Sequence, residues 1–218
     1  MRVNIGCGQT PTPGWDNFDN SLSVRLARLP SGWISALVKL SIIDQGQADF
    51  MAFCRSCNIG YADARALPFR DGQVDVLYSS HMLEHLDRDA AVQFLHEAGR
   101  VLRPGGIMRL AVPDLEAMIL NYMKDRDGDA FLTQTLLTRT DVRSWKSRLL
   151  FLLAGDRGHK HLYDARSLCT FLSEHGFRHP RPMLPGETTI PDPGDLDLRE
   201  REAESLYVEA TTPAVREV

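Results

Sequence analysis

The stretch Val3-Asn4-Ile5-Gly6-Cys7-Gly8 decides the fold of this chain. A short apolar run ends in a Gly-x-Gly turn, which lets the backbone approach a ligand where any side chain would collide. Asp19 follows eleven residues after Gly8, at the end of a second short strand predicted over Asp16–Phe18. Its carboxylate can accept both hydrogen bonds of a ribose diol. Together the turn and the acid predict a nucleotide-binding opening, although either alone also occurs in an ordinary tight turn.

The spacing of apolar residues along the chain predicts further strands and helices. Strands are predicted over Arg2–Ile5, Val74–Tyr78, Ile107–Val112 and Ser205–Thr211. Helices are predicted over Asp89–Leu102, Leu115–Tyr122, Phe131–Leu153 and Asp164–His175. The turn Arg103-Pro104-Gly105-Gly106 ends the first of these helices, so residues 74–112 predict a βαβ unit. The fold class expected is α/β, a Rossmann-like, doubly wound, mostly parallel sheet with an antiparallel last strand and helical cap insertions.

Two stretches are not required by that sheet. Residues 21–60 are predicted to form a flap insertion, with two short amphipathic helices separated at Pro30-Ser31-Gly32. Residues 115–160 are predicted to form a helical cap, interrupted by the polar run Asp125–Asp129. Both insertions are expected to have little core of their own and to order around ligands. The whole chain, 1–218, is expected to be one domain.

Composition narrows the function. The 218 residues, 43% hydrophobic, suffice for one α/β domain. Lys and Arg number 25 and Asp and Glu 29, a net charge of −4 with the signs interleaved, so a nucleic acid partner is not expected. The N-terminus lacks the apolar run of a secretory signal, and we expect a cytoplasmic protein. No apolar stretch approaches the roughly 20 residues of a membrane span.

The cysteines predict neither a disulfide framework nor a metal site. Cys54 and Cys57 form one pair, but a zinc site needs four ligands and no second pair follows. We therefore expect a free dithiol and no bound metal.

Five motifs occur in a fixed order, and they extend over about residues 3–115. They are Val3-Asn4-Ile5-Gly6-Cys7-Gly8, Gly14-Trp15-Asp16-Asn17-Phe18-Asp19, the run from Ala62-Asp63-Ala64 to Leu67-Pro68-Phe69, Tyr78-Ser79-Ser80-His81-Met82-Leu83-Glu84-His85-Leu86, and Gly99-Arg100-Val101-Leu102-Arg103-Pro104-Gly105-Gly106. In this order they resemble the class I S-adenosylmethionine-dependent methyltransferases of the type 11 group. Later pieces resemble the final helix and last antiparallel strand of the same group.

The resemblance implies S-adenosylmethionine as cofactor and a role for each matching residue. Gly6, Cys7 and Gly8 would form the floor under its methionine part, Asp19 would hold the ribose, Asp63 and Ala64 the adenine, and Ser79 and His81 would border the sulfonium. Asn4 and Thr10 depart from the usual acid and third glycine. The short spacing to Asp19 leaves little room for a first helix, so the loop Pro11-Thr12-Pro13-Gly14 is expected in its place.

The histidines bear most on mechanism. His81 follows the Val74–Tyr78 strand and is the candidate general base for a hydroxyl acceptor. His85 lies one helical turn later with Glu84 beside it, and either could orient a partner. His85, His159 and His161 are candidate substrate-binding residues, with a packed helix position or a solvated loop as the alternatives.

The sequence therefore predicts a methyltransferase that acts on a small-molecule or glycan acceptor, with oxygen favoured over nitrogen. The alternative is a non-catalytic binding or scaffold protein that keeps the fold. A nicotinamide dehydrogenase is disfavoured, because Pro11 stands where the third glycine of its turn belongs. The oligomeric state cannot be predicted from these residues.

Overall fold

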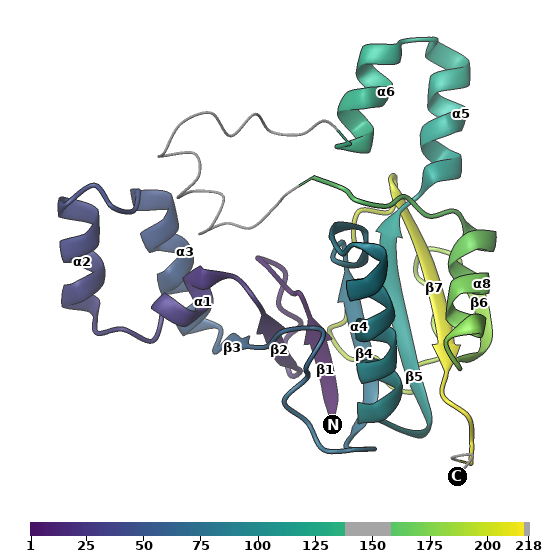
Figure 1. The fold of residues 1–218 in the computed structure, drawn as a ribbon, viewed down its shortest axis with the longest axis horizontal. Coiled ribbons are helices and arrows are strands. Elements are labelled where there is room, and N and C mark those ends of the chain that lie inside the picture. Colours follow the sequence, from purple (N-terminus) through teal and green to yellow (C-terminus); the bar gives the residue numbers. More distant parts are fainter. Residues whose placement is uncertain (138–157, 216–218) are drawn as a thin grey trace.

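The computed structural model describes residues 1–137 and 158–215. Its centre is a seven-stranded sheet in the order β3-β2-β1-β4-β5-β7-β6 (Figure 1). The pairs from β3 to β5 are parallel, whereas β7 is antiparallel to both β5 and β6. The predicted Rossmann-like α/β class with an antiparallel last strand is confirmed.

The strands are β1 (Arg2–Ile5), β2 (Asp16–Asp19), β3 (Gly60–Tyr61), β4 (Val74–Ser80), β5 (Leu102–Pro113), β6 (Arg178–Met183) and β7 (Ser205–Thr211). The described helices are α1 (Leu22–Leu26), α2 (Ser31–Lys39), α3 (Gln45–Ser56), the 3-10 turn η1 (Leu83–His85), α4 (Arg88–Val101), α5 (Leu115–Asp125), α6 (Gly128–Thr135) and α8 (Ala165–Glu174). Every predicted strand is present, and β5 begins earlier than expected, at Leu102. The sequence analysis did not predict α3, β3 or β6.

Helices α4 and α8 pack on one face of the sheet (Figure 1). The Asp87 carboxylate caps α4 through the amide of Ala90, and Asp164 and Ser167 form a capping box that starts α8. Their fully buried side chains, among them Phe94 and Phe171, join the inward residues of the strands in the main apolar core. The packing of this core fixes the positions of the strand ends, and with them the positions of the side chains at those ends.

The opposite face of the sheet is covered by loops. The second apolar cluster joins Trp15, Ile190 and Leu196 from loops to Tyr78 and Tyr207 from strands, and it contains no residue of a described helix. The expected proline-rich loop does replace a first helix after the glycine turn. Asn4 Nδ2 donates to Thr10 O and Thr12 Oγ1, at 3.2 and 3.1 Å, so the residue that departs from the usual acid holds this loop.

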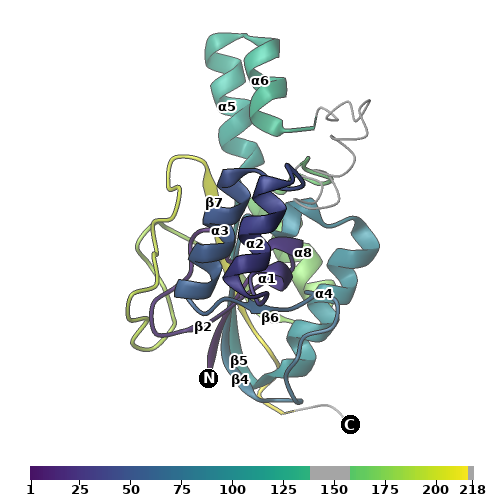
Figure 2. The same ribbon diagram turned by 90° about the vertical axis from the view of Figure 1, so that its left-hand side faces the viewer.

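The flap contains more structure than predicted. The two expected helices are α1 and α2, and α2 begins directly after Pro30. A third helix, α3, starts at a capping box of Asp44 and Gln47. Figure 2 shows the three helices together, and Figure 1 shows them beyond the β3 edge of the sheet. They enclose their own apolar cluster, which includes Val24 and Met51, so the expectation of little core was wrong for the flap.

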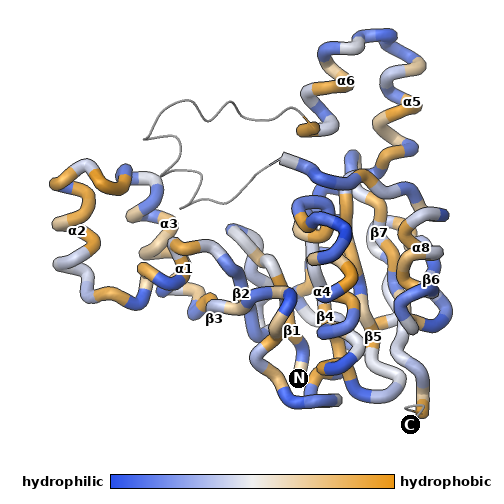
Figure 3. The backbone as a smooth tube through the Cα atoms, in the orientation of Figure 1, coloured by the Kyte–Doolittle hydropathy of each residue, from blue (hydrophilic) through white to orange (hydrophobic). Residues whose placement is uncertain are grey.

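The cap begins with a helical hairpin beyond the carboxyl end of β5 (Figure 1). The predicted helix over Leu115–Tyr122 is α5, and α6 follows after a left-handed residue at Arg126, where the polar break was expected. Several apolar side chains of α5 are exposed, including Leu120 at 63%, and Figure 3 shows the hydrophobic stretches along this hairpin. The predicted helix over Phe131–Leu153 coincides in part with α6, and its remainder from 138 lies outside the described residues.

No helix within residues 1–137 and 158–215 is long and apolar enough to cross a membrane.

Candidate functional site

The glycine turn leaves the sheet at the carboxyl end of β1. Gly6 and Gly8 have φ of +75° and +50°, the left-handed region that favours glycine. A Cβ at Gly6 would lie 2.5 Å from Met82, so this glycine is required by packing inside the chain. A Cβ at Gly8 would meet nothing within 4 Å. The open side of the turn is therefore at Gly8.

Asp19 ends β2 beside that open side. Its Oδ2 accepts from the amide of Gly8 at 3.2 Å, and its Oδ1 accepts from the amide of Ser21 at 2.7 Å. Two backbone donors fix the carboxylate, yet each oxygen keeps a further acceptor position. The geometry brings together the two residues that the sequence paired, Gly8 and Asp19.

The other residues predicted to contact the adenine and the sulfonium differ from one another in their surroundings; they are Asp63, Ala64 and Ser79. Both Asp63 oxygens are engaged by the Arg65 guanidinium, at 3.0 and 2.7 Å, and this hydrogen-bonded partner lowers the pKa of Asp63. Ala64 is buried. Ser79 is 1% exposed, and its hydroxyl makes no hydrogen bond to any described residue. An unpartnered buried hydroxyl near the end of β4 is the kind of group a ligand satisfies.

Cys7 contributes differently from the glycines that flank it. Its amide donates to Phe18 O, its carbonyl accepts from Thr10, and its side chain joins the apolar cluster of the flap. Burial raises the pKa of its thiol, so the sulfur stays protonated. Any contact of Cys7 with a cofactor would thus be one of packing. Cys54 and Cys57 are free thiols, as predicted, and burial raises the pKa of Cys54 to about 11.

His81 follows β4 in a left-handed conformation, with φ of +47°. Such a backbone costs free energy in a residue other than glycine and is typical of functional positions. The Nε2 atom lies 2.9 Å from Ser205 Oγ, and Nδ1 lies 3.5 Å from Oε1 of Glu84. The imidazole is therefore held between a hydroxyl of β7 and a carboxylate of η1.

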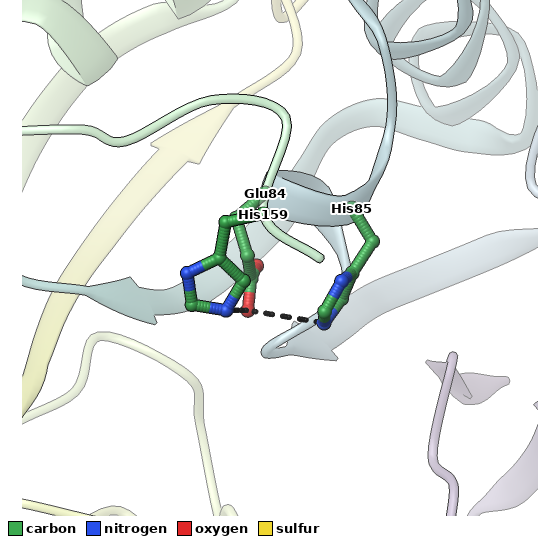
Figure 4. Close-up of side chains that lie close together, drawn as sticks. All are labelled: Glu84, His85 and His159. Atoms are coloured by element: carbon green, nitrogen blue, oxygen red, sulfur yellow. Dashed lines mark ion pairs between the residues drawn. The ribbon is translucent and has the colours of Figure 1, made fainter. Parts of the chain in front are cut away.

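Glu84 is the centre of a histidine cluster (Figure 4). Its side chain is 0% exposed, and neither carboxylate oxygen makes a hydrogen bond to a described residue. Besides His81, Oε1 has Nε2 of His85 at 3.8 Å and Nε2 of His159 at 3.9 Å. An unpaired buried carboxylate costs several kcal/mol, so its environment must supply compensation.

The segment after residue 157 closes the cluster from the other side. The amides of Lys160 and His161 donate to the carbonyl of Glu84, at 2.8 and 3.2 Å. This contact buries His159 against His85, with ring centroids 5.0 Å apart. Burial lowers the pKa of His159, although the Glu84 carboxylate acts in the opposite direction. His161 is exposed beside Tyr163, apart from the cluster.

The structure thus brings together two of the three predicted substrate-binding histidines, His85 and His159, near the predicted base His81. It also adds Glu84, which the sequence analysis noted beside His85 but did not select as a site residue. The signal available was the spacing of His81, Glu84 and His85, which places all three on one short turn after a strand.

Comparisons with known proteins find similar sequences over part of the chain. Residues 42–110 match the model of a methyltransferase domain. Methyltransferase GfsG of Streptomyces halstedii is 29% identical over 114 residues, which cover 52% of this chain and 37% of the relative. An uncharacterized 37.1 kDa protein in transposon TN4556 of Streptomyces fradiae is 38% identical over 60 residues, 28% of this chain and 17% of that protein. The chain thus spans well under half the length of either curated relative.

A solved structure shares the fold across almost the whole chain. It is an S-adenosylmethionine-dependent methyltransferase of Thermotoga maritima, described as a possible histamine N-methyltransferase. The TM-score is 0.51 at 14% identity, with 97% of this chain and 82% of the other covered. The comparisons thus show similarity to a methyltransferase domain over residues 42–110 and a fold shared with this neighbour over almost the whole chain.

Proposed function

We propose that this protein methylates a hydroxyl oxygen of a small-molecule or glycan acceptor, with His81 as general base. The observation that supports the proposal is the position of the His81 imidazole between Ser205 Oγ and the buried Glu84 carboxylate. A carboxylate at Nδ1 orients an imidazole and stabilises its protonated form, which leaves Nε2 to accept the proton of a hydroxyl. Ser205 would yield that position to the acceptor.

We assign the cofactor to the open side of the glycine turn. S-adenosylmethionine supplies a methyl group on a positively charged sulfur, so the chain needs only to bind and align the two reactants. Gly6, Cys7 and Gly8 would lie under its methionine part, Asp19 would accept from the ribose, Asp63 with Ala64 would contact the adenine, and Ser79 would border the sulfonium. The space at Gly8 and the unpartnered Ser79 hydroxyl support this placement.

The acceptor would enter between the flap of residues 21–60 and the cap of residues 115–160, within a single domain. The exposed apolar side chains of α5, such as Leu120, support a role in covering an acceptor. His85 and His159 would line its inner end, and His161 would lie at the outer edge. The cytoplasmic location and the absence of a nucleic acid partner remain predictions.

Calorimetry with S-adenosylhomocysteine and NAD tests the cofactor assignment. We expect binding of the sulfur ligand alone, and Asp19→Ala should weaken it by about 1.5–3 kcal/mol because a charged acceptor is lost. Asp16→Ala, at the exposed start of the same strand, is the control and should bind normally. Binding of NAD with no response to S-adenosylhomocysteine would refute the assignment.

Kinetics of His81→Ala test the chemistry once a hydroxyl acceptor is found by screening. We expect turnover to fall by roughly 10²–10⁴ while affinity for S-adenosylhomocysteine stays within about tenfold. His96→Ala removes an exposed histidine of α4 and should change neither value. If His81→Ala loses cofactor binding and keeps its maximal rate, His81 packs against the cofactor and is not the base. A wild type that binds cofactor but methylates no acceptor favours the scaffold alternative.

A further inference from the structure

The cluster of Glu84, His85 and His159 is not explained by the cofactor turn or by a single histidine base. One carboxylate oxygen and two imidazole nitrogens lie within 4.8 Å of one another, contributed by η1 and by the segment that begins at residue 158. We propose that these three side chains bind one divalent first-row transition metal ion, with Zn²⁺ as the reference case.

The separations are close to those that a shared ion requires. Carboxylate and imidazole ligands bind Zn²⁺ tetrahedrally at about 2.0–2.2 Å, so two ligand atoms on one ion lie about 3.3–3.6 Å apart. Oε1 of Glu84 is 3.8 Å from His85 Nε2 and 3.9 Å from His159 Nε2, slightly longer than those separations. Figure 4 shows the two imidazoles on either side of the carboxylate. Small rotations of the rings would bring all three atoms onto one ion.

The buried carboxylate of Glu84 favours the binding of a cation at this site. Glu84 is 0% exposed, and both of its oxygens lack a hydrogen bond among the described residues. The nearest histidine nitrogen, His81 Nδ1, lies 3.5 Å from Oε1, an ion-pair contact longer than an ordinary hydrogen bond. Buried charges in proteins are paired or coordinate metals, and here pairing is incomplete. A divalent ion would occupy the space that the long separations leave around Oε1.

The second nitrogen of His85 is held as in a metal-binding histidine. His85 Nδ1 lies 3.2 Å from the carbonyl of Gly158, to which it can donate. Donation at Nδ1 fixes the tautomer in which Nε2 carries the lone pair, and Nε2 is the atom that faces Glu84. The backbone bonds from Lys160 and His161 to Glu84 O hold the two halves of the site together. The ligand atoms are thus oriented before an ion arrives.

The ligand set selects the kind of ion. Two imidazoles and one carboxylate suit Zn²⁺ and its first-row neighbours, whereas Mg²⁺ and Ca²⁺ favour oxygen ligands throughout. Three protein ligands leave a coordination position open, as in catalytic zinc sites. An acceptor hydroxyl could take that position beside His81 and would lose its proton more readily there. This last role rests on the proposed function, but the binding of the ion does not.

Titration of chelator-treated protein with Co²⁺, followed by visible absorption, tests the site. We expect one Co²⁺ per chain, displaced by Zn²⁺. His159→Ala and Glu84→Gln should each weaken binding by at least about 100-fold, because a direct ligand is lost. His85→Ala should do the same, and its side chain, 31% exposed, is the least needed for folding. The matched control His96→Ala should bind Co²⁺ like the wild type.

Failure of wild-type protein to bind Co²⁺ saturably would overturn the proposal, and so would equal binding by His85→Ala and wild type. Calorimetry with S-adenosylhomocysteine on the same samples separates the two proposals. Cofactor binding without Co²⁺ binding would remove the metal site and leave the methyltransferase assignment intact. Co²⁺ binding without cofactor binding would retain the metal site and count against the assigned cofactor turn.

Discussion

Two buried glutamates in this protein have opposite surroundings. Glu209 of β7 is 2% exposed and lies directly across from Arg109 of β5, with 2.7 Å between its Oε1 and Arg109 Nη1. It also accepts from the Thr188 hydroxyl at 2.6 Å and from the Thr189 amide at 2.8 Å. The carboxylate of Glu84, equally buried, accepts no hydrogen bond from a described residue.

The difference distinguishes a carboxylate that stabilises the fold from one that belongs to a functional site. A buried carboxylate whose two oxygens are both hydrogen-bonded holds its elements in one arrangement, as Glu209 with Arg109 and the threonines holds β5, β7 and the loop around residue 188. An unsatisfied buried group needs an explanation outside the folded chain itself, such as a ligand, an ion or a catalytic role. We therefore read Glu209 as structural and Glu84 as part of a site, and the same substitution at both positions tests that reading.

The largest expected effect is at the satisfied glutamate. Glu209→Gln should lower the free energy of unfolding by about 3–5 kcal/mol, because it leaves the buried guanidinium of Arg109 without its counter-charge. Arg109→Met should cost a similar amount from the other side, and the double variant should recover part of the loss. Urea denaturation with circular dichroism measures each value. A loss below about 1 kcal/mol in both single variants would place this pair among ordinary surface pairs.

The elements around Glu209 show what the sequence could predict. Apolar periodicity located β4, β5, β7, α4 and α8, because each has one face buried in the main core. Arg109 stands inside the apolar run Ile107–Val112, but nothing local shows that its partner lies in the last strand. Strand β6 was missed because Pro180 and Pro182 interrupt it, and proline is tolerated there only because β6 is an edge strand.

The glycine turn and its acid could be predicted from the sequence, whereas the histidine cluster around Glu84 could not. Gly8 and Asp19 lie eleven residues apart and form a local contact, so a motif could reveal them. The cluster at Glu84 depends on His159, which arrives from a distant segment through backbone bonds to Glu84 O. No spacing rule connects these residues, and the metal-free expectation drawn from the cysteine pair did not consider them. Only the tertiary structure brings the carboxylate and the histidines together.

The next effect is smaller and has the opposite sign. Glu84→Gln should raise the free energy of unfolding of chelator-treated protein by about 1–2 kcal/mol, because a neutral amide is cheaper to bury than an unpartnered carboxylate. The measurement belongs at about pH 8, above the ordinary titration range of imidazole. Glu209→Gln is the matched control, since it makes the same chemical change in a satisfied site. If both variants are equally destabilised, Glu84 is a structural anchor and the contrast fails.

The smallest expected effect is in the acid limb of stability. Burial acts to raise the pKa of Glu209, but hydrogen bonds from Thr188, Thr189 and Arg109 outweigh it, so the pKa lies below its ordinary value of 4.5. A carboxyl group with a lowered folded-state pKa contributes stability that is present above its unfolded pKa and lost as the pH falls through the folded one. The free energy of unfolding of the wild type should therefore fall as the pH drops below about 4.5.

Four other acids also have lowered pKa values and contribute to that fall; they are Asp63, Asp75, Glu97 and Asp164. The contribution of Glu209 is isolated by difference, because Glu209→Gln should show a shallower slope than the wild type between about pH 4.5 and pH 3. Parallel slopes in wild type and Glu209→Gln would show that Arg109 and the threonines do not favour the ionised form.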